Sequence, residues 1–513
     1  ENKLQYSIRP ETHEFITKQV LTGHIWEKET VPERKDQYYI REVARSIQAW
    51  FKENTATDKG KFLEILLSRV KLIVNVVDDK EEKIFSSLNG GKVNLDGADL
   101  LRAILMTRAA KEKYHGTSAT SEVREFRIRM GMELDLMNLW FGKTADYFKQ
   151  FISDQTIGMA RINRFDFTTL PINLLYLLYY EYRRNEKESL NFSFFEYGKN
   201  SNGNPDDDRW EMYLELQEMY AILQRWYNDK ELYHYLGFLF NFKAQTPFRD
   251  IYTQWKALNS RDKFLKNIQH TIATRMLDRY LEETEKAAPD YQKCLKTMTE
   301  AISDFRENWY NNDKELYQIL ILLDIFRILD SKSIKKLPTD YFTRKSGQKD
   351  GEDKEHILSQ TPRKDNGEIT TIKTDWEKFV QSEDFKDIRS QMQEILNHSD
   401  AELTEQELTQ LQNLLNSAGL NSIGNMVLLD LRINRSYGNA DYAHKRTIIF
   451  QEYMNQKYVR PHTLAVFMKG DIDAREATGI PLNRWTLEDI KRNTDKIAKE
   501  IGKNFNAWLT QNN

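Results

Sequence analysis

Four residues in the last third of the chain have the side chains that phosphodiester hydrolysis requires. Glu355 and His356 are neighbours in DKEHILSQ, Asn425 precedes the apolar run MVLL, and Asn434 lies in RINRSYGN. A neutral imidazole can take a proton from water near pH 7. Hard divalent cations prefer carboxylate and amide oxygens, and such a cation neutralises charge on the phosphate and on the leaving oxygen. The pattern is typical of a ββα-metal nuclease site.

Each of these residues takes one role in this interpretation. His356 is the general base, and Glu355 and Asn434 are the ligands of Mg²⁺ or Mn²⁺. Asn425 fixes either the orientation of the imidazole or the hairpin around it. Neighbours in a regular strand point to opposite faces, so Glu355 and His356 share a site only where the strand ends, twists or bulges. Asp353 is therefore the alternative ligand. A surface histidine and two turn asparagines would show the same letters, and this alternative stays open.

A short hairpin and a helix must position these side chains. We expect the hairpin to run through 354–365 and 424–431, with a helix that starts near Asn434 or Asn439. The acidic stretch 375–415 between the two strands has helical spacing. Because negative charge repels DNA, we expect this insert to point away from the substrate or to act as a gate.

The composition of the whole chain favours a mainly α protein. Its 513 residues include only 10 Pro and 21 Gly, so helix breakers are rare, and 12% aromatic residues argue against disorder. We expect an α+β protein overall, mainly α, with a small ββα-metal (HNH-like) module embedded in helices. The run KLIVNVV from Lys71 predicts a remnant α/β edge near residues 60–110. Asp96 has the type and place of a helix N-cap.

Charge and cysteine content narrow the class of function. A formal net charge of −3 excludes a globally basic nucleic-acid binder. Residues 421–470 nevertheless hold seven basic and three acidic side chains, which favours a bound phosphate backbone. With Cys294 as its single cysteine the chain has no disulfide framework and no Cys-based zinc site, and a cytoplasmic location is expected. The chain shows no secretory signal and no apolar run of bilayer length, so we expect no membrane partner.

A short segment occurs twice in the helical middle of the chain, and we call it the echo. WYNDKELY (Trp226–Tyr233) recurs with one inserted Asn as WYNNDKELY (Trp309–Tyr317), and each copy leads into an apolar helix. Two copies do not make a solenoid. We interpret them as core helices with amphipathic aromatic residues at their ends.

Together these segments resemble the GmrSD-type family of modification-dependent restriction and phage-defence nucleases. The most specific matches lie in KEHILSQ, NSIGNMVLLDLRINRSYGNADYAHKRTII, VRPHTLAVFMKG and RWTLEDI. Nearer the start, KLQYSIRPETHEFI and IFSSLNGGKVNLDGADLLRAIL are similar to segments that follow the family's nucleotide-site motif. That motif, DGQQR, does not occur in this sequence, which begins at Glu1, and we expect the native protein to begin further upstream.

The resemblance implies an order of domains and additional contacts. Residues 1–110 would be the remnant of an N-terminal nucleotide-hydrolysing or sensor module of ParB/sulfiredoxin-like fold. Residues 111–330 would form a helical middle domain, and 331–513 an HNH-type nuclease domain with the helical insert 375–415. The resemblance supports the roles given above and adds Arg435, Lys445 and Arg446 as contacts to the DNA backbone. It implies an HNH-type endonuclease that cuts foreign, including modified, DNA. An NTP would act through the upstream segment, and a homodimer would suit cleavage of two strands.

Two other classes of function stay open. One is a helical nucleic-acid sensor or adaptor whose nuclease-like domain is inactive. The intact set of Glu355, His356, Asn425 and Asn434 argues against it. The other is a regulator that hydrolyses NTP, which would require the DGQQR segment.

Overall fold

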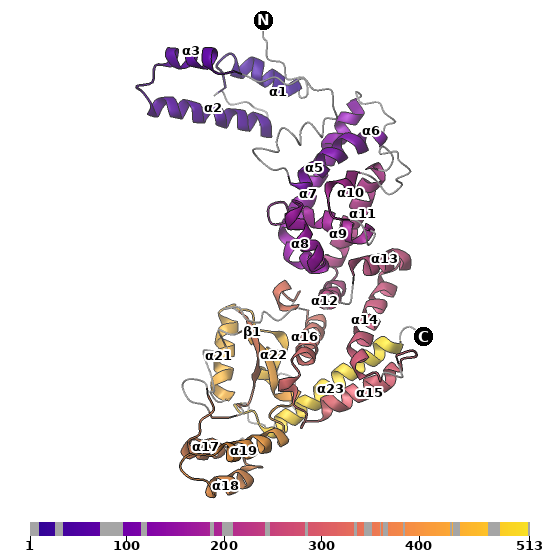
Figure 1. Cartoon of the computed structure of the whole chain (residues 1–513), viewed down its shortest axis with the longest axis vertical. Coiled ribbons are helices and arrows are strands. Elements are labelled where there is room, and N and C mark those ends of the chain that lie inside the picture. The colour runs from indigo at the N-terminus through magenta and orange to yellow at the C-terminus, as the bar shows by residue number, and fades with distance from the viewer. Residues whose placement is uncertain are drawn as a thin grey trace. The chain divides into compact units, whose positions relative to one another are not determined.

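The computed structural model divides into two compact units, Glu1–Lys80 and Glu81–Asn513, and each is considered by itself (Figure 1). KLIVNVV and the segment IFSSLNGGKVN lie outside the described residues apart from Lys71, so the expected α/β edge stays a prediction. The structure describes residues 10–25, 34–71, 96–113, 121–184, 189–196, 209–241, 247–282, 286–332, 336–342, 351–359, 361–362, 368–382, 385–430, 433, 442–469 and 483–510.

The first unit is helical. Asp58 caps α3 by accepting from the backbone amides of Gly60 and Lys61. Trp50 at the end of α2 lies against Phe62 of α3, with 6.0 Å between ring centroids. These contacts join two helices that leave much apolar side-chain surface exposed. The described elements are α1 (Pro10–Phe15), the π-helical turn η1 (Ile16–Val20), α2 (Lys35–Glu53) and α3 (Lys59–Arg69).

The second unit begins with a helix whose cap was expected. Asp96 precedes α5, and its side chain accepts from the backbone amide of Ala98, which confirms the predicted N-cap. The helix α9 (Asn173–Arg183) forms from an apolar run of the sequence. Its side chains are buried on every face of the helix, as expected for a helix without a polar face. The elements of this part are α5 (Gly97–Ile104), η2 (Leu105–Ala109), α6 (Ala110–Lys113), α7 (Ser121–Phe148), η3 (Lys149–Phe151), α8 (Asp154–Ile162), α9 (Asn173–Arg183), α10 (Phe192–Glu196) and α11 (Arg209–Asn228).

Further helices extend this core towards the C-terminal part. The two copies of the echo fall at equivalent places, at the start of α12 and at the start of α16. Trp226 and Trp309, the first residues of the copies, are both fully buried, as expected for core helices. The elements are α12 (Lys230–Phe240), α13 (Phe248–Leu258), α14 (Arg261–Leu277), η4 (Asp278–Tyr280), α15 (Tyr291–Ser303), η6 (Trp309–Asn311), α16 (Asp313–Asp330) and η7 (Thr339–Phe342).

A buried histidine ties α12 to the segment before η7. Nδ1 of His234 lies 2.5 Å from the carbonyl oxygen of Lys230, and Nε2 accepts from the backbone amide of Leu337 at 2.9 Å. An imidazole that donates through one nitrogen and accepts through the other is neutral. Burial lowers the pKa of His234 to about 4.

This low pKa predicts acid sensitivity of the second unit. The unfolded imidazole, with a pKa near 6.5, takes up a proton more readily than the folded one, so stability is full above pH ~6.5 and falls as the pH drops towards 4. His234→Gln keeps an acceptor for Leu337 but has no charge to gain. Its urea midpoint is expected to fall less between pH 7 and pH 5 than that of the wild type. The exposed His398→Gln serves as the control, and equal pH dependence of His234→Gln and the wild type would contradict the assignment.

The C-terminal part contains a sheet of two antiparallel strands, β1 (Glu352–His356) and β2 (Met426–Asp430). Glu355 pairs with Val427 and His356 pairs with Met426. Three helices, α17 (Lys373–Val380), α18 (Arg389–Asn397) and α19 (Glu405–Ser417), lie between the strands in the sequence, which confirms that the insert is helical. The short turn η9 (Ile423–Asn425) leads into β2. The remaining helices are α21 (Tyr442–Met454), α22 (Pro461–Met468) and α23 (Leu487–Thr510).

The two faces of this sheet belong to two different hydrophobic cores. Met426 and Leu428 pack into the large core of the helical middle. Val427 and Leu429, which alternate with them along β2, pack into a smaller core with α17–α19, α21 and α22. The long helix α23 lies along α15 and also contacts η9 (Figure 1). The sheet is therefore covered on both sides.

The structure confirms that the protein is mainly α. Strand pairing occurs where the hairpin was expected, although β1 starts at Glu352 and ends at His356, earlier than the range 354–365. The expected helix start near Asn434 or Asn439 lies outside the described residues, and α21 begins at Tyr442. The complete ββα module and the domain boundaries at 110 and 330 stay predictions. Within the described ranges, none of the helices has the length and apolar character to cross a bilayer.

Candidate nuclease site

His356 lies at the end of β1, on the face of the sheet that meets the helical middle. Its ring stacks on Tyr310 of η6, with centroids 4.8 Å apart and planes inclined by 20°. Its Nε2 lies 2.9 Å from Oδ1 of Asn421, just before η9. The residue is buried, with 7% of its surface exposed, and these two contacts hold the imidazole in place.

Glu355 points to the other face of the sheet, as alternation along a strand requires. Its Oε1 forms an ion pair with Nζ of Lys445 on α21 at 3.1 Å. The same ammonium donates to the carbonyl oxygen of His356 at 2.7 Å. Burial lowers the pKa of Lys445, and Glu355 opposes this shift. The pair joins α21 to the end of β1.

Asn425 ties the backbone that follows β1 to the backbone that precedes β2, at one end of the sheet. Its Oδ1 accepts from the amide of Leu358 at 2.8 Å, and its Nδ2 donates to the carbonyl oxygens of Leu358 (3.0 Å) and Leu420 (2.8 Å). The side chain is fully buried. Two roles were expected for Asn425, and these backbone contacts fit the role of fixing the hairpin. Asn421, four residues earlier, contacts the imidazole.

The structure describes only some of the other residues that were predicted to belong to the site. Asn434 and Arg435 lie outside the described residues, so their roles stay predictions. Arg446 is half-buried, and its Nε donates to the carbonyl oxygen of Phe467 at 3.0 Å. Asp353, the alternative ligand, accepts from the hydroxyl of Tyr317 at 3.3 Å.

Much of the excess positive charge in residues 421–470 is buried and neutralised inside the protein. Three of its cationic side chains are buried and paired with carboxylates: Lys445 with Glu355, Lys469 with Asp489, and Arg460 with Glu352 and Asp324. In this arrangement the ammonium of Lys445 faces Glu355 and not solvent. The count of basic residues in the sequence therefore overstates the charge that this segment presents to a phosphate backbone. A contact of Lys445 or Arg446 with DNA stays a prediction.

In each copy of the echo, the tyrosine that follows the tryptophan binds the side chain of a lysine. In the first copy, the carbonyl oxygen of Tyr227 accepts from Nζ of Lys336, which lies 3.6 Å from the centroid of the Tyr227 ring. In the second copy, Tyr310 binds Lys354 of β1 in the same way, with Nζ 4.0 Å from its ring centroid. The last tyrosine of each copy bonds beside that lysine: Tyr233 to the carbonyl oxygen of Leu337, and Tyr317 to Asp353. The second copy thus anchors β1.

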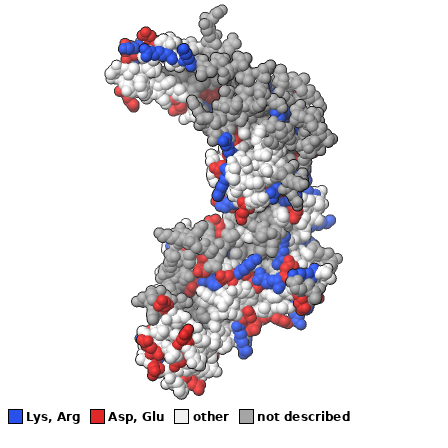
Figure 2. All heavy atoms as spheres, in the orientation of Figure 1, with Lys and Arg blue, Asp and Glu red and all other residues white. Residues whose placement is uncertain are grey.

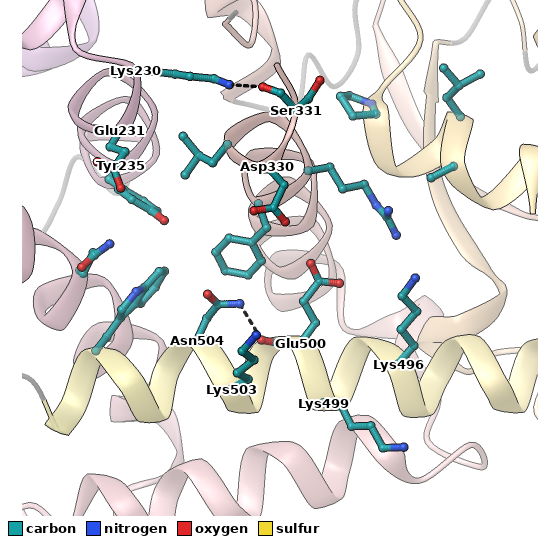
Figure 3. Close-up of a pocket in the computed structure, with 18 of the residues that line it drawn as sticks. Lys230, Glu231, Tyr235, Asp330, Ser331, Lys496, Lys499, Glu500, Lys503 and Asn504 are labelled. Atoms are coloured by element: carbon teal, nitrogen blue, oxygen red, sulfur yellow. Dashed lines mark hydrogen bonds between the residues drawn. The ribbon is translucent and has the colours of Figure 1, made fainter. Parts of the chain in front are cut away.

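A groove lies apart from these residues, between α12, α16, α22 and α23 (Figure 3). It encloses about 1070 Å³. Lys230, Lys496 and Lys503 line it together with Glu231, Asp330 and Glu500, and aromatic side chains of α12, α16 and α23 contribute as well. None of the predicted site residues that the structure describes lines this groove. Its mixed charges do not single out an anionic or a cationic ligand.

Acidic side chains gather on the α17–α19 segment in the view of Figure 2, as the sequence of the insert indicated. These carboxylates come from all three helices and from the turns between them. Whether the insert points away from a bound substrate stays a prediction. The acidic residues in the described part of the segment are Asp375, Glu377, Asp387, Glu394, Asp400, Glu402, Glu405 and Glu407.

The chemistry of the donors fits a hard divalent cation. The Glu355 carboxylate and the His356 carbonyl oxygen already converge on one cationic group, the ammonium of Lys445. Oxygen donors of this kind suit Mg²⁺ or Mn²⁺, and restriction endonucleases generally use divalent metals. Among the described residues, no group of three or more His, Cys, Asp or Glu side chains gathers to hold a metal.

Sequence reasoning missed two residues that hold the imidazole. Tyr310 lies in the echo, which we had interpreted as core packing alone, and Asn421 stands among several asparagines before β2. No spacing rule singles out either residue, because both reach His356 from segments that are distant in the sequence. The fold brings them together, because the backbone amide of Trp309 in η6 bonds to Asn421 just before β2.

The fold and this site define a mainly helical protein with a covered two-stranded hairpin that ends in a Glu–His pair. Residues 299–500 match the family model described as GmrSD restriction endonucleases, C-terminal domain. Searches of curated proteins and of solved structures find no match. This part of the chain is therefore similar to the GmrSD C-terminal domain, and the resemblance seen in the sequence is confirmed. A domain of this family indicates a nuclease that acts on DNA in defence.

Proposed function

We propose that this chain is a metal-dependent DNA endonuclease of the HNH type, directed against foreign, including modified, DNA in the cytoplasm. One observation supports the proposal: the match to a restriction endonuclease domain spans the two paired strands, and Glu355 and His356 are the last two residues of β1. His356 takes the role of general base, Glu355 and Asn434 hold the cation, and Asn425 fixes the hairpin. A bound Mg²⁺ or Mn²⁺ would neutralise charge that develops on the phosphate and the leaving oxygen.

The arrangement around His356 supports this role. His356 is the last residue of β1, and the backbone that follows it is held by Asn425 through the amide and the carbonyl oxygen of Leu358. The site also has a rigid frame, because Asn425 bonds both the backbone that follows β1 and the backbone that precedes β2. A general base must be held within hydrogen-bond reach of the water that it deprotonates.

The test is a plasmid-nicking assay with Mg²⁺ or Mn²⁺ on plain and on modified DNA. His356→Ala is expected to nick at least ~10²-fold more slowly than the wild type, because general-base catalysis contributes that much. His356→Gln, which keeps a donor for Asn421, should show the same loss with less disturbance of the fold. The exposed His398→Ala is the matched control and should nick within twofold of the wild type, since surface substitutions change little.

Three results decide the proposal. Loss of nicking in both His356 variants, with full activity of His398→Ala, supports it. Equal activity of the wild type and the His356 variants would show that His356 is not the base. If no variant nicks, divalent-metal titration of the wild type beside Glu355→Ala and Asn434→Ala separates an inactive adaptor from an enzyme that needs its NTP-dependent segment. An inactive domain would bind Mg²⁺ or Mn²⁺ no better than these variants.

A further inference from the structure

The imidazole of His356 is held from two directions. Tyr310 covers one face of the ring, and Oδ1 of Asn421 meets Nε2 at 2.9 Å. These two partners are themselves linked, because the backbone amide of Trp309 donates to the carbonyl oxygen of Asn421 at 2.9 Å. Lys354 fixes Tyr310 further by donating to its carbonyl oxygen. The ring position is therefore set by contacts that reinforce one another.

The direction of the Asn421 amide determines which imidazole nitrogen carries the proton. Its Nδ2 donates to Oδ1 of Asn416 at 2.6 Å, so its Oδ1 is the atom that faces His356. An amide oxygen only accepts hydrogen bonds, and Nε2 must therefore be the donor. A neutral imidazole has one N–H, so its basic lone pair is on Nδ1.

We propose that Asn421 is a positioning residue that keeps His356 in the Nε2–H tautomer and thereby makes Nδ1 the atom that deprotonates water. This inference rests on the proposed nuclease function. In the step it serves, a water O–H bond breaks and the proton moves to Nδ1. The water oxygen bonds to phosphorus while the bond to the leaving oxygen breaks, and that oxygen takes a proton from solvent. The imidazolium keeps its Nε2–H bond to Asn421.

The sequence left this task open as one of two roles for Asn425, whose side chain contacts backbone only in its described hydrogen bonds. Asn421 is 5% exposed and bonds to two side chains, Asn416 and His356. Residues that orient a reacting group in this way typically contribute 10–100-fold to activity. A purely structural asparagine would affect stability without selecting a tautomer.

The experiment uses the full chain labelled with ¹⁵N-histidine at one pH near 8, where imidazoles are neutral. The ring-nitrogen shifts of His356, assigned by their absence in His356→Gln, report the tautomer. Asn421→Leu removes the acceptor at similar volume, whereas Asn421→Asp keeps an acceptor oxygen towards Nε2. The exposed Asn397→Leu is the control for an Asn-to-Leu change elsewhere. Nicking rates at saturating DNA are measured on the same preparations.

We expect the Nε2–H tautomer in the wild type and in Asn421→Asp, and a mixture of tautomers in Asn421→Leu with nicking reduced 10–100-fold. Asn397→Leu should match the wild type in both readouts. The Nδ1–H tautomer in the wild type would overturn the inference, as would an unchanged tautomer and rate in Asn421→Leu. If the tautomers follow the expected pattern but even the wild type does not nick, the positioning by Asn421 stands, and the metal titration described above decides the nuclease function.

Discussion

Replacing Arg460 by Met is expected to lower the free energy of unfolding of the second unit by about 3–5 kcal/mol, because it leaves two buried carboxylates without their cationic partner. The guanidinium of Arg460 donates to Glu352 of β1 at 2.6 and 2.8 Å and to Asp324 of α16 at 2.7 Å. All three side chains are at most 6% exposed. Asp324 also accepts from the backbone amide of His462 at 2.7 Å. One cation thus connects β1, α16 and the start of α22.

The loss of stability in Arg460→Met should increase with pH. Burial already raises the pKa of Asp324, and Arg460 opposes that shift. Without Arg460 the folded Asp324 carboxyl binds a proton more tightly than the unfolded one, so the deficit grows as the pH rises above the unfolded pKa near 4. Urea unfolding at pH 5 and pH 8 measures both effects. Arg492→Met removes a partly exposed pair with Asp489 at 3.5 Å and should cost less than ~1 kcal/mol. Similar losses in the two variants would contradict the assignment.

Gly424→Ala is the second change with a large expected effect, at or above the upper end of the ~1–3 kcal/mol typical of overpacking. A Cβ on Gly424 would lie 2.3 Å from the carbonyl oxygen of Ile490 and from Oγ1 of Thr494, and 2.7 Å from the amide nitrogen of Thr494. Two of these atoms are backbone of α23, which cannot rotate away. The turn before β2 or the whole helix must move instead.

The matched control for Gly424→Ala is Gly158→Ala in α8, where a Cβ would meet nothing within 4 Å. Because alanine is a better helix former than glycine, this variant should be as stable as the wild type or more stable by about 0.5–1 kcal/mol. Chemical denaturation of both proteins measures the contrast. Moving η9 also displaces the neighbouring Asn425, so Gly424→Ala should lose nicking activity as well. Equal stability of the two variants would show that α23 is not packed against this turn.

Much of the fold was predictable because it depends on local sequence. Rare Pro and Gly indicated helices, Asp96 marked a helix start, and the spacing in 375–415 gave the helical insert. The apolar run MVLL indicated the second strand, whereas its register against β1 was not predicted. The burial of both sheet faces was not predictable, because it depends on which distant helices cover the hairpin.

The site was predictable in its residue types and less so in its contacts. His356 and Asn425 lie on the paired strands and their turn, as expected. The caution that strand neighbours point apart also holds, since Glu355 meets α21 while His356 meets η6. The roles of Asn421, Tyr310 and the buried Lys445 could not be inferred, because a count of charges or amides carries no information on burial or long-range pairing.

The hairpin cannot open by itself, because its two faces complete two separate hydrophobic cores. Separating β1 from β2 would expose apolar side chains on both sides, at about 25 cal/mol for each Å² of newly wetted surface. The strands therefore belong to the most slowly opening part of the second unit, the part whose amides exchange with solvent only when the whole unit unfolds. Any adjustment that admits a substrate must come from the segments around the hairpin, while the strand end that bears His356 serves as the fixed point of reference.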